Sequence, residues 1–268
     1  MSAKRIALVG CGGLGREIAA GIQAGRAGNY ILSGIFTDQP ELTVRHAEEF
    51  GCTAYSSLGM LLSDAPDFAV EAAGGSALRE LLEPAIRRHI PVIPLSVGVF
   101  SDAAYLARIR RLAAACRTRV YLPAGAVGGF DLMSAAALDP DLSAAIRTEK
   151  PPKALADAPY LGNRELPIDR SEQVFSGTAS EAIQAFPKNV NVAVAVGLAT
   201  VGPDQLSVTV TNNPELASNR HTVELDGEFG HASIQISAKP SSNAHSSRLA
   251  AYSVIGLLKR LDTWVGFI

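Results

Sequence analysis

Six residues near the N-terminus have the spacing of a dinucleotide-binding turn. Gly10, Gly12 and Gly15 fall in the segment GCGGLG, which follows the apolar run IALV directly. In this pattern the first glycine permits a tight turn, the second lets the backbone approach a pyrophosphate, and the third lets a helix pack closely on a strand. The N–H groups that begin the next helix would then face the phosphates. The hexapeptide, Gly13 included, therefore predicts dinucleotide binding.

The acidic residue that would bind the adenosine ribose lies one position beyond the expected one. It is expected about 20 residues beyond the glycines, at the end of the second strand. Thr37 occupies that position here, and Asp38 follows it. Asp38 either reaches the ribose and favours NAD, or is a solvated turn residue, and the residues leave both readings open. No arginine follows directly to bind a 2′-phosphate, so NAD and NADP both remain candidate coenzymes.

One of the five histidines lies in an alternating segment. In residues 219–225, alternation predicts that His221 shares a strand face with Val223, whereas Arg220 lies on the other face. A histidine on an apolar face is either a satisfied core residue or a general base. Sequence physics alone leaves these alternatives open.

Other polar residues give weaker signals. His46 and His89 fall in helical patterns, where we expect them at the surface. Asn189 either caps the helix that follows or, with Asn191, supplies an amide near the site. Lys188 is either an ordinary solvated lysine or a cation for an anionic substrate.

Several classes of function are excluded or disfavoured. No HExxH, CxxC or clustered-carboxylate spacing predicts a metal site, and no GxSxG segment predicts a serine hydrolase. Lys and Arg number 24 against 26 Asp and Glu, giving 24 − 26 = −2, so we expect no binding to nucleic acid or anionic lipid. No run approaches the roughly 18 apolar residues of a membrane helix. Three scattered cysteines fit a reducing cytoplasm.

The first 122 residues alternate short β-type runs with helical patterns. That alternation predicts a doubly wound parallel sheet, covered on both faces, as the fold of a dinucleotide-binding domain at 1–122. The expected strands are 5–9, 31–37, 68–72, 91–95 and 118–122. The expected helices are 14–22, 41–50, 77–89 and 103–116.

The pattern changes after residue 122 and predicts a smaller α+β domain at 123–245. A glycine-rich crossover leads into a helix at 130–137, and an apolar helix is expected at 189–200. Runs at 205–211, 220–225 and 233–238 predict consecutive strands of a mainly antiparallel open sheet. A final helix within 246–268 is expected to present Leu249, Tyr252, Ile255, Leu258 and Leu261 on one side. A chain of 268 residues suits two domains.

The chain resembles the L-aspartate dehydrogenases, which are built like homoserine dehydrogenase and dihydrodipicolinate reductase. The resemblance runs from one end of the chain to the other. Its matching segments are GCGGLG (10–15), EAAGG (71–75), LSVGVFSD (95–102), LPAGAVGGFD (122–131), FPKNVNVAVAVGLA (186–199), NPELASNRHTVE (213–224), GEFG (227–230) and LAAYSVIGLLK (249–259).

The resemblance implies roles for particular residues. His221, in the Asn-x-His segment, would be the catalytic residue, and Ala126 and Asn191 would contact the coenzyme. By the same analogy, Gly12, Leu14 and the Ala73-Gly74 turn would border the phosphates and the nicotinamide ribose. The family also implies NAD(P)-dependent oxidative deamination of L-aspartate, a homodimer formed through the open sheet, a last helix that returns to the first domain, and delivery of iminoaspartate to NAD biosynthesis.

The substrate's two carboxylates need cations or N–H donors, for which Lys188, Arg220 and His245 are the candidates, with Asn189 beside them. The chain departs from the family at 243–247, which reads NAHSS in place of Asn-Pro-Lys-Thr-Ser, and the loop at 150–162 lacks the usual tryptophan. Two alternatives therefore stay open: a dehydrogenase of another small amino or hydroxy acid, and a non-enzymatic NAD(H)-binding redox sensor.

Overall fold

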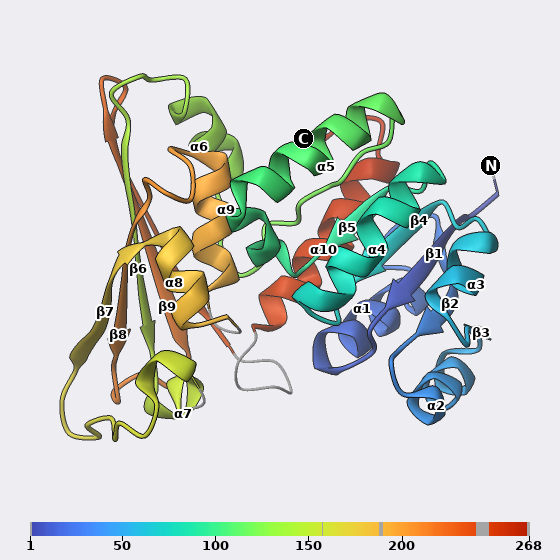
Figure 1. Ribbon diagram of the computed structural model, residues 1–268, viewed down its shortest axis with the longest axis horizontal. Helices are drawn as coiled ribbons and strands as arrows, with labels where there is room; N and C mark the ends of the chain where they lie inside the picture. Colours follow the sequence, from blue (N-terminus) through green and yellow to red (C-terminus); the bar gives the residue numbers. More distant parts are fainter. Residues whose placement is uncertain (1, 157, 188–189, 240–246, 267–268) are drawn as a thin grey trace. The chain divides into compact units, whose positions relative to one another are not determined.

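The computed structural model describes residues 2–156, 158–187, 190–239 and 247–266. The chain divides into two compact units (Figure 1). The first comprises Met1–Val99, Ala103–Pro123 and Ala250–Ile268, and the second comprises Phe100–Asp102 and Ala124–Leu249. Each unit contains one five-stranded sheet.

The sheet of the first unit is parallel throughout, which confirms the predicted fold class. Its strand order is β3-β2-β1-β4-β5, so the order reverses between β1 and β4, where such folds bind their ligands. The strands are β1 (Lys4–Val9), β2 (Tyr30–Phe36), β3 (Thr53–Ala54), β4 (Phe68–Glu71) and β5 (Val92–Pro94).

The strand expected at 118–122 is wrong. This segment makes a single parallel bridge, between Val92 and Val120. The neighbouring strand β5 has only three residues, and Pro123 ends the extended run where the chain passes into the second unit. The segment therefore has too short a partner to form a sixth strand.

Helices of the first unit bury apolar stripes against this sheet. Leu78, Leu81, Leu82, Ala85 and Ile86 are fully buried on α4, which confirms the stripe that 77–89 predicted. The helices are α1 (Gly13–Gln23), α2 (Pro40–Phe50), α3 (Leu58–Ser63), α4 (Gly75–Arg87), α5 (Ala103–Ala115) and α10 (Arg248–Asp262), with a 3₁₀ turn at Val97–Ser101.

Helix α10 joins the core of the first unit although it lies at the other end of the sequence. Ile255 is buried as expected, but Leu249 and Tyr252 are exposed. The buried stripe is formed instead by Ala251, Val254, Ile255, Leu257 and Leu258. The expected face is therefore confirmed at Ile255, Leu258 and Leu261, which contact the core of the first unit, and wrong at Leu249 and Tyr252.

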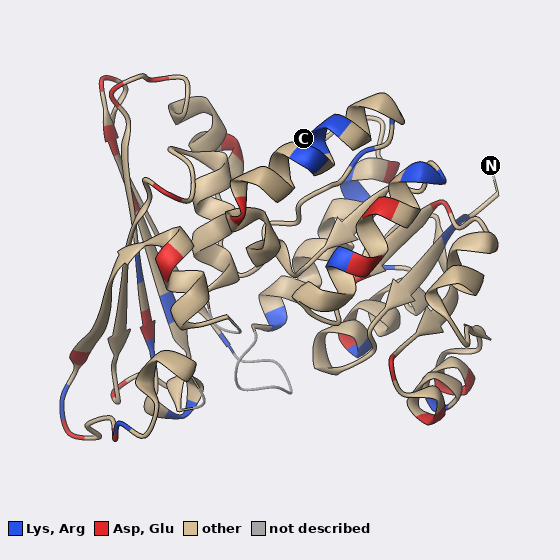
Figure 2. Cartoon of the chain, viewed as in Figure 1, with Lys and Arg blue, Asp and Glu red and all other residues tan. Residues whose placement is uncertain are grey.

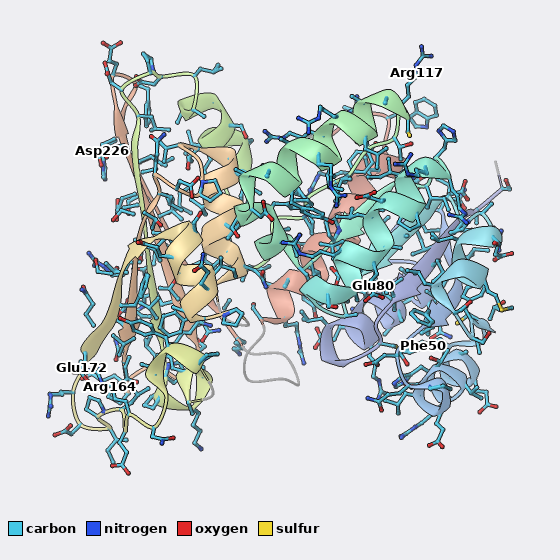
Figure 3. All side chains as sticks on the ribbon, in the orientation of Figure 1. Phe50, Glu80, Arg117, Arg164, Glu172 and Asp226 are labelled. Carbon is cyan, nitrogen blue, oxygen red and sulfur yellow. The ribbon has the colours of Figure 1, made fainter. Side chains whose placement is uncertain are left out.

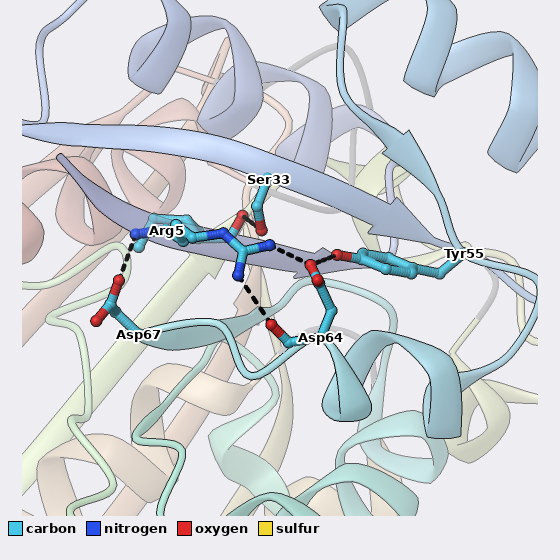
Figure 4. A network of polar contacts seen from close by, with 6 residues as sticks. Arg5, Ser33, Tyr55, Asp64 and Asp67 are labelled. Atoms are coloured by element: carbon cyan, nitrogen blue, oxygen red, sulfur yellow. Dashed lines mark hydrogen bonds and ion pairs between the residues drawn. The ribbon is translucent and has the colours of Figure 1, made fainter. Parts of the chain in front are cut away.

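Hydrogen bonds and an ion pair connect the start of β1 to the segment before β4 (Figure 4). The Arg5 guanidinium forms an ion pair with Asp64 and donates to its backbone oxygen at 2.8 Å. Tyr55 donates its hydroxyl to the same carboxylate, and the backbone N–H of Arg5 donates to Asp67 at 2.7 Å. These contacts hold β1 and β4 together at the amino edge of the sheet, opposite the carboxyl edge where the glycine turn begins.

The second unit has a mixed sheet in the order β10-β9-β6-β8-β7. β6 and β8 are parallel, and the other neighbouring pairs are antiparallel. The strands are β6 (Ser143–Lys150), β7 (Glu172–Thr178), β8 (Ser207–Asn212), β9 (Asn219–Gly227) and β10 (Gly230–Ala238).

The prediction that the last three strands are consecutive neighbours is wrong for one pair. β9 and β10 are adjacent, but β6 lies between β8 and β9. β6 reads SAAIRTEK, and its small and charged residues hide a strict alternation of buried and exposed positions. Low apolar content therefore concealed the central strand of the sheet.

Helices cover one face of this sheet, where the core of the second unit lies (Figure 1). Helix α9 buries Ala193 to Gly197 continuously. The helices are α6 (Phe130–Ala136), α7 (Pro152–Leu155), α8 (Ala179–Ala185) and α9 (Asn191–Ala199), with a 3₁₀ turn at Pro159–Leu161. Figure 2 shows that acidic and basic residues are interspersed in both units. In Figure 3 Arg164 lies beside Glu172, with which it pairs at 2.6 Å.

The packing of α10 on α1 can be tested at Gly21. A Cβ at this position would overlap Cδ1 of Ile255, so Gly21→Leu should lower the free energy of unfolding by about 1–3 kcal/mol through overpacking. Thermal unfolding followed by circular dichroism measures the effect. Ala20→Leu, at an exposed neighbouring position of the same helix, serves as the control. An unchanged melting temperature in Gly21→Leu would contradict the packing described.

Candidate active site

The glycine turn after β1 has the close contacts that its sequence predicts. Gly10 has a φ of +88°, which favours glycine, and a Cβ there would lie 2.6 Å from the Cβ of Ala73. A Cβ on Gly15 would collide with the carbonyl of Gly10. Two of the three glycines are therefore required by backbone packing between β1, α1 and the turn that follows β4.

Gly12 differs from its neighbours because the space around it is open. No atom lies within 4 Å of the position a Cβ would take. Gly12 is the N-cap residue of α1, no side chain caps the helix, and its first turn has no acidic residue. The uncovered N–H groups and the helix dipole suit a pyrophosphate at this point. The turn therefore fits a dinucleotide, held by Gly10, Gly12, Gly13, Leu14 and Gly15.

A buried carboxylate organises the turn after β4. Glu71 is fully buried, and its Oε1 accepts hydrogen bonds from the N–H groups of Ala73 and Gly74, both at 2.7 Å. The Ser96 hydroxyl donates to Oε1 at 2.9 Å, and the Ser96 N–H donates to Oε2 at 3.0 Å. Burial raises the pKa of Glu71, and the four donors oppose that effect. Glu71 therefore joins two turns at the carboxyl edge of the sheet.

The acidic residue that was expected to bind the ribose, Asp38, lies just after β2. Asp38 is exposed, whereas Thr37 is tied inward by a 2.8 Å hydrogen bond to the buried Thr43 hydroxyl. Both roles considered for Asp38 remain compatible with this position.

His46 is buried, so its expected surface position is wrong. It lies 3.3 Å from Glu49, whose carboxylate also pairs with Arg16 at 2.5 Å. These contacts join α1 and α2. They also offset part of the free-energy cost of burying the imidazole of His46.

In the second unit, His221 lies on the inward face of β9, and the predicted alternation is confirmed. Its side chain is buried. Nδ1 lies 3.1 Å from the hydroxyl of Thr148, which is the cross-strand neighbour of His221 on β6. Burial, with the charge of Lys150 as a second cause, lowers the pKa of His221 to about 3. The imidazole is therefore neutral near pH 7 and held in a fixed orientation.

Lys150 is the other ionisable residue of this inward face. Its side chain is 1% exposed, and burial lowers its pKa to about 8. Sequence analysis missed Thr148, Lys150 and Glu71 as site residues. The signals that could have found them were the alternation hidden in SAAIRTEK and the acid that closes the apolar strand FAVE.

The other sequence-predicted residues are distributed differently. Arg220 lies on the face opposite His221, where it pairs with Glu149 at 3.4 Å, so it is not brought to the imidazole. Ala126 is buried in the loop before α6, and Asn191 is the first residue of α9. Ala73 and Gly74 form the turn held by Glu71. Lys188, Asn189 and His245 lie outside the described residues.

A pocket of about 490 Å³ in the second unit has a mainly apolar wall and contains none of the sequence-predicted residues. Its wall includes Pro151, Lys153, Leu216 and Asn219.

Within the described ranges, no three His, Cys, Asp or Glu side chains are grouped as a metal site. The same ranges contain no helix long and apolar enough to cross a membrane.

A parallel sheet with an open glycine turn, followed by a mixed sheet that holds a neutral histidine, defines the class of two-domain nicotinamide-dependent dehydrogenases. The family model described as "Aspartate dehydrogenase, C-terminal" matches residues 131–261, and "Homoserine dehydrogenase, NAD binding domain" matches residues 10–123. The chain belongs to the L-aspartate dehydrogenase family.

Individual relatives agree with this assignment. An L-aspartate dehydrogenase of Methanosarcina barkeri is 36% identical and covers 96% of both chains. One from Bradyrhizobium diazoefficiens is 34% identical, covering 96% of this chain and 91% of the relative. Among solved structures, aspartate dehydrogenase from Thermotoga maritima has a TM-score of 0.75 at 24% identity and covers 99% of each chain. Homoserine dehydrogenase from Thermoplasma acidophilum has a TM-score of 0.59 at 13% identity, covering 97% and 99%.

The role of Glu71 leads to a prediction about coenzyme binding. Glu71→Ala leaves the N–H groups of Ala73, Gly74 and Ser96 without their acceptor. The turn against Gly10 should loosen, and the dissociation constant for NADH should rise about tenfold or more, since an orphaned buried donor costs about 1–3 kcal/mol. Quenching of tryptophan fluorescence or enhancement of NADH fluorescence measures it. Glu80→Ala, on the exposed side of α4, is the control, and equal affinities in the two variants would refute the role.

Proposed function

We propose that the protein catalyses NAD(P)-dependent oxidative deamination of L-aspartate. Family membership over nearly the whole chain is the observation that carries this proposal. In the overall reaction, L-aspartate, oxidised coenzyme and water give oxaloacetate, ammonium ion, reduced coenzyme and one proton. A coenzyme held at the glycine turn would supply the acceptor for the hydride that leaves Cα of the substrate. The first unit supplies the turn for the coenzyme, and the second supplies the histidine.

His221 is suited to act on water. The oxidised substrate carries an imine, and its hydrolysis requires a water to lose a proton as its oxygen attacks the imine carbon. A neutral imidazole can accept this proton, whereas an imidazolium cannot. Thr148 holds the Nδ1 edge of the ring at 3.1 Å, which leaves Nε2 as the nitrogen for the proton transfer. His221 is thus the proposed general base.

The proposed base is tested by substitution. His221→Ala should lower turnover with L-aspartate about 100-fold or more, the size typical of losing a general base, while NADH still binds. The production of NADH or NADPH is followed by absorbance, and coenzyme binding by fluorescence.

His231→Ala is the matched control because His231 is an exposed histidine on the neighbouring strand, paired with Asp226 at 2.7 Å. Near-normal turnover in His221→Ala would remove the mechanism. Wild-type protein that oxidises another small amino or hydroxy acid but not aspartate would instead move the specificity to that substrate.

We further propose a homodimer formed through the outward face of the second sheet. The inward positions of β6 pack in the core, and its outward positions, among them Ala145 and Arg147, are partly or fully exposed. β6 is the central strand of this sheet, so the face is broad enough for an isologous contact. The supply of iminoaspartate to NAD biosynthesis stays a prediction from the family.

Ala145→Arg tests this assembly. The substitution places a bulky cation on the central strand, and two-fold symmetry would bring two of them together. We expect wild-type protein to have the mass of a dimer in light scattering and the variant to have that of a monomer. Ala115→Arg, on the exposed surface of α5, should remain dimeric. A monomeric wild-type protein would contradict the proposal.

A further inference from the structure

Three neighbouring strands of the second sheet change from apolar to polar side chains at the same end. On β6 the inward face passes from Ile146 to Thr148 and Lys150. β8 changes from Val210 to Asn212, which is beside Lys150 in the register. On β9, Val223 is followed along the inward face by His221, the neighbour of Thr148. The buried polar members are Thr148, Lys150, Asn212, Asn219 and His221.

Burying a lysine at this end of the sheet is costly, since a charged ammonium loses its hydration. Lys150 is buried in this way, and its charge acts on the imidazole of His221. The neighbouring charges of the same strands, Glu149 and Arg220, pair with each other on the opposite face. An anionic group that lies beside both Lys150 and His221 would be attracted by the ammonium group.

Asn212 is a second sign that a ligand completes this cluster. The side chain is fully buried, and its Nδ2 donates to the carbonyl of Pro167 at 2.7 Å. Its Oδ1 has no hydrogen-bond partner in the described part of the chain. A buried acceptor without a donor costs free energy unless something else supplies one. The amine of an amino acid would be such a donor.

We propose that Lys150 is a substrate-binding residue whose ammonium group receives one carboxylate of the dicarboxylic amino acid beside His221. The inference rests on the proposed function, because it assigns a position to that substrate. It also replaces Arg220, which sequence analysis offered for this role and which faces the other way.

A carboxylate at this position would change both ionisable groups. Burial lowers the pKa of Lys150 to about 8, and the charge of Lys150 contributes to the lowered pKa of His221. An anion between them favours their charged forms and raises both values. His221 would then be a stronger base with substrate bound than without it. Of the groups on adjoining strands, β8 offers only the neutral Asn212, and β10 presents apolar residues inward.

Kinetics of Lys150→Met test the proposal directly. Loss of a charge-assisted contact should raise KM for L-aspartate about 10- to 100-fold, while the dissociation constant for NADH stays at the wild-type value. Lys153→Met is the control, since Lys153 is exposed and lies on the wall of the apolar pocket. An unchanged KM in folded Lys150→Met would overturn the proposal, as would a rise in KM confined to Lys153→Met, which would place the carboxylate in that pocket.

A second measurement uses protein that keeps a cation at position 150. Succinate is a dicarboxylate without an amine, and its binding to the NADH-saturated protein is measured by calorimetry in buffers of different ionisation enthalpy. Near pH 8.5, above the lowered pKa of Lys150, wild-type protein should take up at most about three quarters of a proton per succinate. Lys150→Arg should bind succinate without this uptake, because arginine is already charged.

The outcomes separate the inference from the proposed function. Succinate binding with no proton uptake in wild-type protein and with equal affinity in folded Lys150→Met would overturn the role of Lys150. Lys150-dependent succinate binding by a protein that does not oxidise aspartate would support the carboxylate site and overturn the proposed activity instead.

Discussion

The hydrogen bond between Thr148 and His221 is the contact on which the candidate site depends. It exists because β6 inserts between β8 and β9, which makes the two residues cross-strand neighbours. Burial then keeps the imidazole neutral, and the hydroxyl fixes which nitrogen faces away from the strand. The same register brings Lys150 to the inward face. A single strand order therefore sets the orientation, the charge state and the electrostatic surroundings of the proposed base.

The first unit also has a buried ionisable residue at the end of a strand, and this residue is an acid. Glu71 ends an apolar strand, is fully buried, and gathers the backbone N–H groups of two turns. Those turns lie against Gly10, whose positive φ and close contact with Ala73 leave no room for a side chain. Each unit thus buries one ionisable side chain where its sheet ends, and such groups are typical of functional sites rather than of stable cores. A packing role alone would be served as well or better by apolar side chains of similar volume.

Much of this could be predicted from sequence. The parallel sheet, the glycine turn and the alternation around His221 follow from local patterns that tertiary contacts reinforce. The order of the second sheet could not be predicted, because β6 pairs with strands more than fifty residues away and carries few apolar residues. His46 was misplaced since its burial depends on Glu49 and on contact between two helices. Lys150 was missed because a buried cation is recognised only when its strand face is known.

The protonation state of His221 tests the central claim most directly. Its pKa is lowered, so the unfolded chain binds a proton below about pH 6.5 that the folded chain refuses until about pH 3, and folding stability falls through that range. Nitrogen-15 NMR of histidine-labelled protein, assigned with His221→Ala, reports the ring directly. A neutral ring from about pH 8 down to pH 5 is the result expected of an enclosed imidazole bonded to Thr148. A ring that titrates near pH 6.5 would show that it is solvated, and would contradict the account.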